Sequence, residues 1–151
     1  MTRVGGQDLR DPDANDEIPP FDGIAGDGFE LRLRSSKIYR PSGSPVYLLD
    51  VFSDADERIG LASLILEKDV ENVADVGHLC ATLVSTAFDP LLQRVASSLV
   101  SYARAKGIER VRIVVPAEDT HSVQASDAIG PSTKDQSMAS DGRQLVIFEY
   151  W

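Results

Sequence analysis

The chain has 151 residues, with 24 acidic and 15 basic side chains and a formal net charge of −9 at pH 7. Its length is that of one domain with a sizeable core. The acidic balance argues against nucleic-acid binding; it could attract cationic partners such as amines or lysine-rich peptides, or it could serve solubility alone. No run is apolar enough for a signal peptide or a membrane span, so we expect a cytoplasmic protein that does not act at a membrane. One cysteine and two scattered histidines allow no internal disulfide and imply no metal site.

Residues 1–28 are expected to form a flexible acidic tail, followed by one folded domain over residues 29–151. The segment 1–28 carries seven acidic and two basic side chains, a net charge of 2 − 7 = −5, with glycine and proline interspersed. It contains few apolar residues. Such a composition buries too little apolar surface to offset the entropy lost on ordering.

Three strands are predicted in the first half of the folded domain. Apolar and charged residues alternate over 29–34, as in a half-buried strand. The apolar runs 46–52 and 59–66 flank a turn-rich segment, 53–57, and therefore predict an antiparallel hairpin. The segment 36–45 contains two prolines and a glycine, so no helix is expected between the first two of these strands.

The middle of the chain is the most informative part, because a strand, a helix and a second strand follow one another without interruption. Residues 80–88 are rich in apolar and β-branched side chains, as in a buried strand. Asp89 can cap a helix start, Pro90 suits its first position, and Gly107 can end the helix. Along this helix one face is apolar, with Leu92, Val95, Ala96, Leu99 and Ala103. The next apolar run, 111–115, completes the pattern of a parallel βαβ crossover.

The C-terminal part is predicted to add a short helix between Asp119 and Ile129 and a last strand over 145–150. The polar, turn-rich segment 131–142 is expected to be a mobile loop. His121 lies at the start of the short helix. Its imidazole could act there as an acid or a base, or it could be solvated like most histidines at helix starts.

Residues 85–130, STAFDPLLQRVASSLVSYARAKGIERVRIVVPAEDTHSVQASDAIG, resemble the central motif of the GNAT N-acetyltransferase superfamily. In that family a strand, a pyrophosphate-binding loop, a helix and a second strand bind acetyl-CoA. The resemblance implies an α+β fold: a mixed, mostly antiparallel sheet with a central parallel βαβ crossover and helices packed on it. It extends over roughly residues 29–151, without the two helices that usually follow the first strand and line the acceptor site.

The family's phosphate loop reads Arg or Gln, two residues, Gly, one residue, then Gly or Ala, and the helix pattern places it on residues 91–96. Leu91 stands at the first position, Arg94 replaces the first glycine, and Ala96 fits the last position. Arg94 could pair with phosphate near a helix N-terminus, or it could be a solvated residue on the helix surface. The resemblance implies that acetyl-CoA is contacted by Val84, Thr86, Arg94, Val95, Ala96, Ser97 and Asp119.

Two functions remain open. The first is an N-acetyltransferase in which a small amine or a protein amine attacks the thioester of acetyl-CoA directly. The second is a GNAT-fold protein that has lost the cofactor and binds a partner. The family resemblance favours the first, which we predict. The missing loop glycines favour the second, as does Ser126 at the position of the family's tyrosine, and no catalytic residue is assigned. The acceptor side would be open to solvent or completed by a second copy of the chain or another protein.

Overall fold

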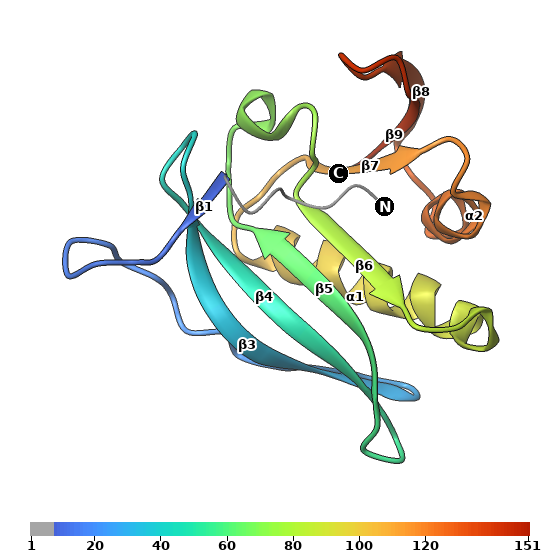
Figure 1. Ribbon diagram of the computed structural model, residues 1–151, viewed down its shortest axis with the longest axis horizontal. Coiled ribbons are helices and arrows are strands. Elements are labelled where there is room, and N and C mark those ends of the chain that lie inside the picture. The colour runs from blue at the N-terminus through green and yellow to red at the C-terminus, as the bar shows by residue number, and fades with distance from the viewer. Residues whose placement is uncertain (1–7) are drawn as a thin grey trace.

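The computed structural model describes residues 8–151, which form two antiparallel sheets and two α-helices (Figure 1). The first sheet has the order β1-β3-β4-β5-β6, with β2 paired to β3, and the second has the order β7-β9-β8. The strands are β1 (Leu9–Arg10), β2 (Ile24–Gly26), β3 (Phe29–Tyr39), β4 (Ser44–Ser53), β5 (Arg58–Ile65), β6 (Leu79–Leu83), β7 (Val111–Pro116), β8 (Thr133–Met138) and β9 (Gln144–Tyr150). The helices are α1 (Asp89–Ala105) and α2 (Thr120–Ala128), and two 3-10 turns are η2 (Val70–Val73) and η3 (Thr86–Phe88). The predicted α+β class and mostly antiparallel sheet are confirmed.

The three strands predicted in the first half are present, and the predicted hairpin is β4 and β5. Strand β3 is longer than its alternating pattern indicated, and it reaches Tyr39, which pairs with Ser44 at the start of β4. A tight turn over residues 40–43 joins the two strands. As expected, no helix lies between them.

The prediction of a flexible tail is wrong for residues 8–28, whereas residues 1–7 lie outside the described part of the chain. Strands β1 and β2 both pair with β3. The ring of Phe21 lies between those of Tyr47 and Tyr102, with ring centroids 5.3 and 5.2 Å away. The Tyr47 hydroxyl donates a hydrogen bond to the Pro19 carbonyl. Although the segment is acidic overall, its few apolar side chains pack against the core.

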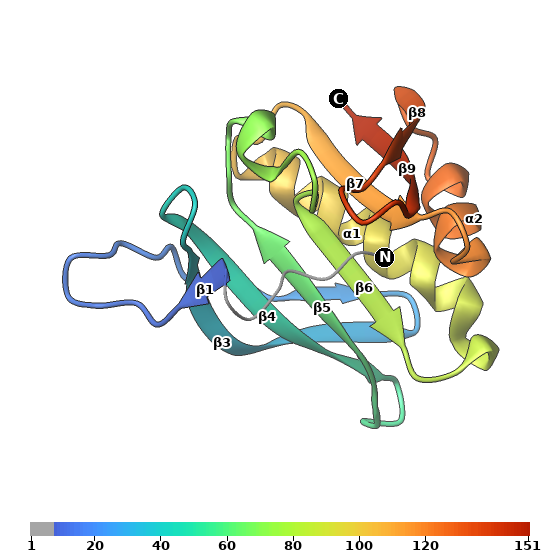
Figure 2. The same ribbon diagram turned by 45° about the horizontal axis from the view of Figure 1, so that its top comes forward.

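Helix α1 covers one face of the first sheet, as Figure 2 shows. It begins within one residue of the predicted position, and Gly107, with a φ of 97°, follows its end. The predicted apolar face is confirmed and also includes Val100: the buried residues are Leu92, Val95, Ala96, Leu99, Val100 and Ala103. They pack against buried side chains of the sheet that include Tyr47, Leu49, Val51 and Leu64. Burial of this face on the sheet forms the main core.

The prediction of a mobile loop over 131–142 is wrong, because the segment contains β8. This strand pairs with β9 from Thr133 opposite Glu149 to Met138 opposite Gln144. It lies at the edge of the second sheet, and all but its first residue are exposed. Backbone hydrogen bonds suffice to hold such an edge strand, so its side chains show no apolar alternation to reveal it.

Strands β6 and β7 follow one another through α1 in the predicted order, but the parallel pairing is not confirmed. They belong to different sheets, and in residues 8–151 they are joined at one isolated antiparallel bridge between Gly77 and Ile113. Gly77 has a φ of 75°, and a Cβ atom there would lie 2.8 Å from the carbonyl oxygen of Arg112. Glycine therefore permits this close approach. From this contact β6 and β7 diverge (Figure 1).

Candidate functional site

A cleft of about 230 Å³ lies between the C-terminal half of β6 and the first turns of α1 and α2. Its lining combines three kinds of side chain. The apolar ones are Leu83, Val84 and Leu92; the hydroxyl-bearing ones include Thr82, Ser85, Thr86 and Ser122; the ionisable ones are Asp89, Asp119 and His121. Such a mixture of apolar walls and a few converging polar groups is typical of ligand sites.

The cleft lies where β6 ends, and this strand ends earlier than predicted. The strand over residues 80–88 was expected to run to Phe88, but β6 ends at Leu83. The Ser85 hydroxyl accepts a hydrogen bond from the backbone N–H of Ala87 at 3.2 Å and so starts the η3 turn. Helix α1 follows directly at Asp89 and Pro90. Its N-terminal end, which carries the positive end of the helix dipole, therefore lies at the cleft.

An Asp–His pair joins the two helix starts at this cleft. The Nδ1 atom of His121, in the first turn of α2, lies 2.7 Å from Oδ2 of Asp89, the first residue of α1. The two side chains are 51% and 38% exposed, so solvent and ligands can reach them. A carboxylate on one ring nitrogen orients an imidazole and leaves its second nitrogen for proton transfer.

Three of the seven predicted cofactor-binding residues meet in the cleft: Val84, Thr86 and Asp119. Asp119 also caps α2, because its carboxylate accepts a hydrogen bond from the N–H of Ser122 at 3.2 Å. These residues come from the end of β6, the η3 turn and the start of α2. The three residues therefore line one cleft, and their contact with acetyl-CoA stays a prediction.

The other four predicted residues lie elsewhere. Val95 and Ala96 are fully buried in the core, and Arg94 donates a hydrogen bond to the carbonyl of Asp27 at 3.2 Å. Ser97 lines a separate hollow beside β9. The predicted loop over 91–96 is helical, because α1 begins at Asp89.

The segment that does precede the helix is 84–88, and Ser85 and Asp89 were missed as cleft residues. The adjacent Asp89 and Pro90, an ordinary helix start, were the sequence signal that could have placed the loop correctly. Placement by the helix pattern failed, because it put the loop inside α1, which already begins at Asp89.

The segment before β6 is held to β7 by His78, which is fully buried. Its backbone N–H donates to the carbonyl of Arg112 at 2.7 Å, and the Arg112 N–H donates to Nδ1 of the ring at 2.9 Å. The Nε2 atom lies 2.8 Å from the carbonyl oxygen of Glu67, and so carries the proton. Burial lowers the pKa of His78 below 6.5. This neutral histidine links the segment before β6 to β7 where the two strands begin to diverge, and both of its ring nitrogens have hydrogen-bond partners.

We expect His78 to make folding stability depend on pH. Its pKa is about 6.5 in the unfolded chain and lower in the folded protein, so below that pH the unfolded chain binds the extra proton. The free energy of unfolding should therefore fall as pH decreases from about 6.5 towards the folded-state pKa. Urea unfolding across this interval should show a smaller pH dependence in His78→Asn.

His121→Asn is the matched control, because the chain has only these two histidines and His121 is half exposed. In this control the free energy of unfolding should change with pH as steeply as in the unmodified protein. A His78→Asn variant that retains the full slope would contradict the assignment.

The described residues contain no group of three or more histidine, cysteine, aspartate or glutamate side chains placed to hold a metal ion. None of the helices in residues 8–151 is both long and apolar enough to cross a membrane. Cys80 is buried, as predicted.

Comparison with known proteins finds similarity of structure only. No protein-family model and no curated protein matches the sequence. A protein of Sphaerobacter thermophilus, provisionally named an acetyltransferase, is similar with a TM-score of 0.57 and 12% identity over 84% of this chain and 94% of its own. The aminoglycoside acetyltransferase AAC(6')-Ib, solved in complex with coenzyme A, is similar with a TM-score of 0.53 and 12% identity over 68% of this chain and 65% of its own. The chain therefore shares the fold of these two acetyltransferases, in agreement with the fold that its sequence resemblance implied.

Proposed function

We propose that the protein is an acetyltransferase that transfers the acetyl group of acetyl-CoA to an amine in the cleft between β6 and the first turns of α1 and α2. The observation that carries this proposal is the Asp89–His121 pair at a cleft in the fold of acetyltransferases. When bound, acetyl-CoA supplies an acetyl thioester: the amine nitrogen bonds to the acetyl carbon as the carbon–sulfur bond breaks, and the amine proton ends on the sulfur.

The lining of the cleft fits the uncharged arm of acetyl-CoA better than its phosphates. Leu83 and Val84 offer apolar contacts, and the hydroxyl-bearing side chains can bond to amide groups. Phosphate would be held by the N-terminal end of α1 and the Thr86 hydroxyl. No lysine or arginine lines the cleft among the described residues, and Asp89 adds a negative charge there. We therefore expect binding weaker than at sites with a cationic side chain.

His121 is our candidate for proton transfer. Asp89 holds the ring through Nδ1, so the second ring nitrogen can take a proton from the amine and deliver it to the leaving group. Ser126, at the position of the family's tyrosine, is fully buried and cannot serve this purpose in the cleft. The Asp89–His121 pair thus takes the place of the family's tyrosine, which this chain lacks.

Calorimetry with acetyl-CoA, followed by assays of thiol release with a panel of amines, tests the proposal. His121→Gln should lower kcat by about 100-fold, because a positioned acid or base contributes about that much, while the Kd of acetyl-CoA should change little. Ser101→Ala, on the exposed face of α1, serves as the control that should change neither quantity. No heat at millimolar acetyl-CoA would overturn the proposal and favour a partner-binding protein.

A further inference from the structure

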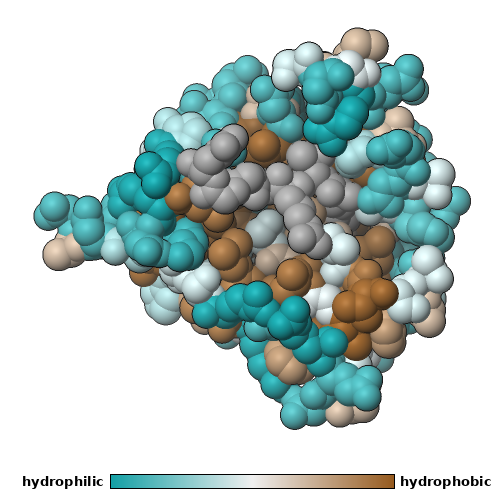
Figure 3. Space-filling view, viewed as in Figure 1, coloured by the Kyte–Doolittle hydropathy of each residue, from teal (hydrophilic) through white to brown (hydrophobic). Residues whose placement is uncertain are grey.

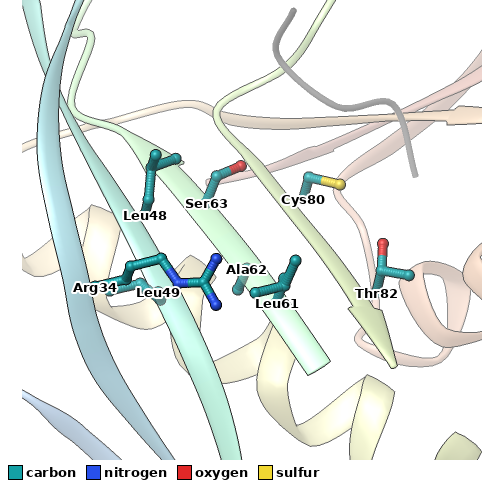
Figure 4. Close-up of a pocket in the computed structure, with 8 residues that line it drawn as sticks. All are labelled: Arg34, Leu48, Leu49, Leu61, Ala62, Ser63, Cys80 and Thr82. Atoms are coloured by element: carbon teal, nitrogen blue, oxygen red, sulfur yellow. The ribbon is translucent and has the colours of Figure 1, made fainter. Parts of the chain in front are cut away.

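A second pocket opens on the face of the first sheet opposite α1 (Figure 4). It has a volume of about 180 Å³, and its lining includes Arg34, Leu48, Leu61, Ser63, Cys80 and Thr82. Pockets for drug-sized ligands span ~300–1,000 Å³. The smaller volume suits a molecule about the size of one amino acid.

This face is open because the turn between β3 and β4 carries no helix. At one end the face is covered by η2, where Val73 packs against Val46 and Ile65. On the visible part of this face, Figure 3 shows apolar residues towards the inside and hydrophilic ones at the rim. The pocket lies in that apolar region, between β3 and β6.

Arg34 reaches the pocket because of a β-bulge. The register changes from Leu33 opposite Leu49 to Ser35 opposite Leu48, so Arg34 is the extra residue of β3. Bulges redirect side chains and are common near active sites. In Figure 4 the Arg34 side chain extends across β4 towards Leu61 and Ala62.

The charge around Arg34 is positive, although the chain is acidic overall. Its Nη2 atom lies 2.8 Å from Oδ1 of Asp50, and Nε of Arg58 lies 3.6 Å from the same oxygen. Two guanidinium groups therefore share one carboxylate, a local charge of 2 − 1 = +1. The Arg34 side chain is 43% exposed, so its remaining N–H groups can bind an anion.

Thr82 of β6 lines both the pocket and the cleft, so the two sites are neighbours. The charges on their far sides are opposite. Arg34 and Arg58 give a positive end, whereas Asp89 and Asp119 give a negative end in the cleft. A molecule with a carboxylate and an ammonium group would complement both ends.

We infer that the pocket binds the acceptor of the proposed acetyl transfer, and that this acceptor is a small apolar amino acid or a closely similar amino-carboxylate. Its carboxylate pairs with Arg34, its side chain lies against Leu48 and Leu61, and its amine points past Thr82 into the cleft. The inference rests on the proposed function. To that function it adds a substrate class, and it assigns to Arg34 the selection of this class.

The test compares L-leucine with L-leucinamide, which keeps the amine and the side chain but lacks the carboxylate. In the unmodified protein kcat/KM should be higher for leucine. Arg34→Gln should reduce kcat/KM for leucine by about tenfold and leave that for leucinamide unchanged, because the variant removes a charge-assisted contact to the carboxylate. Arg143→Gln is the control, since Arg143 pairs only with exposed Asp141 near β9 in the described structure. Equal use of both amines, or an Arg34→Gln variant that affects both alike, would overturn the inference.

A binding measurement separates this inference from the proposed function. Leucine added to the protein without acetyl-CoA should shift the backbone amide NMR signals of Leu61 and Thr82, and Arg34→Gln should abolish the shifts. Arg34-dependent binding without acetylation would support the pocket and contradict the proposed function. Acetylation of other amines with no leucine binding at millimolar concentration would support the proposed function and contradict the assignment of the pocket.

Discussion

Replacing Glu149 with alanine is expected to lower the free energy of unfolding by about 3 kcal/mol, because it would leave a buried guanidinium without its counter-ion. Nε and Nη2 of Arg112 each lie 3.1 Å from Oε2 of Glu149, and Nη1 donates to the carbonyl of Ala74 at 3.0 Å. The two charged side chains are only 16% and 9% exposed. Urea unfolding at neutral pH measures the loss.

Asp141→Ala provides the comparison for this prediction. Asp141 pairs with Arg143 at 2.7 Å, but both side chains are more than half exposed. Exposed pairs contribute ~0–1 kcal/mol, so this variant should differ little from the unmodified protein. If the two variants lose similar amounts of stability, the Arg112–Glu149 pair is not the buried link between β7 and β9 that the structure indicates.

The second large effect concerns acetyl-CoA binding, and it rests on the proposed function. Thr86→Glu should raise the Kd of acetyl-CoA about tenfold or more, because it adds a negative charge beside the N-terminal end of α1. Two like charges ~4 Å apart repel by ~4 kcal/mol at an effective dielectric of ~20, and solvent and salt reduce this to about 1.4 kcal/mol, which is tenfold. Thr86 is exposed, so the fold should tolerate the change. Calorimetry measures the Kd.

Arg94→Ala distinguishes the observed cleft from the site that the sequence predicted. Arg94 contacts the carbonyl of Asp27 and does not line the cleft, so its loss should leave the Kd unchanged. A higher Kd of acetyl-CoA in Arg94→Ala, together with an unchanged Kd in Thr86→Glu, would place the phosphates beside residues 91–96 instead. The two variants therefore test whether the phosphate site lies at Thr86 or beside residues 91–96.

The elements that were predicted correctly share a local signal. The hairpin of β4 and β5 has two apolar runs around one turn, and α1 has an apolar face, an Asp–Pro start and a glycine after its end. Each of these signals depends on residues close together in the chain. Helix and strand periodicity is therefore enough to identify them.

The failures have a different origin. The edge strand β8 is held by backbone hydrogen bonds, which any residue except proline can make, so its polar sequence looks like a loop. In the segment 8–28, Phe21 packs between Tyr47 and Tyr102, two residues far along the chain. Neither arrangement leaves a periodic pattern. Composition alone was therefore a poor guide to both segments.

The amino-acid sequence alone determined the order of the elements from β3 to α2, the last strand β9 and the buried face of α1, because spacing along the chain controls which side chains share a face. Only the tertiary structure decided where the site lies. It brings Asp89 to His121 and Arg34 towards Thr82. It also divides β6 and β7 between two sheets, while Gly77 and His78, just before β6, stay in contact with β7. These contacts join residues from separate elements, and their geometry follows from how the two sheets and α1 pack together.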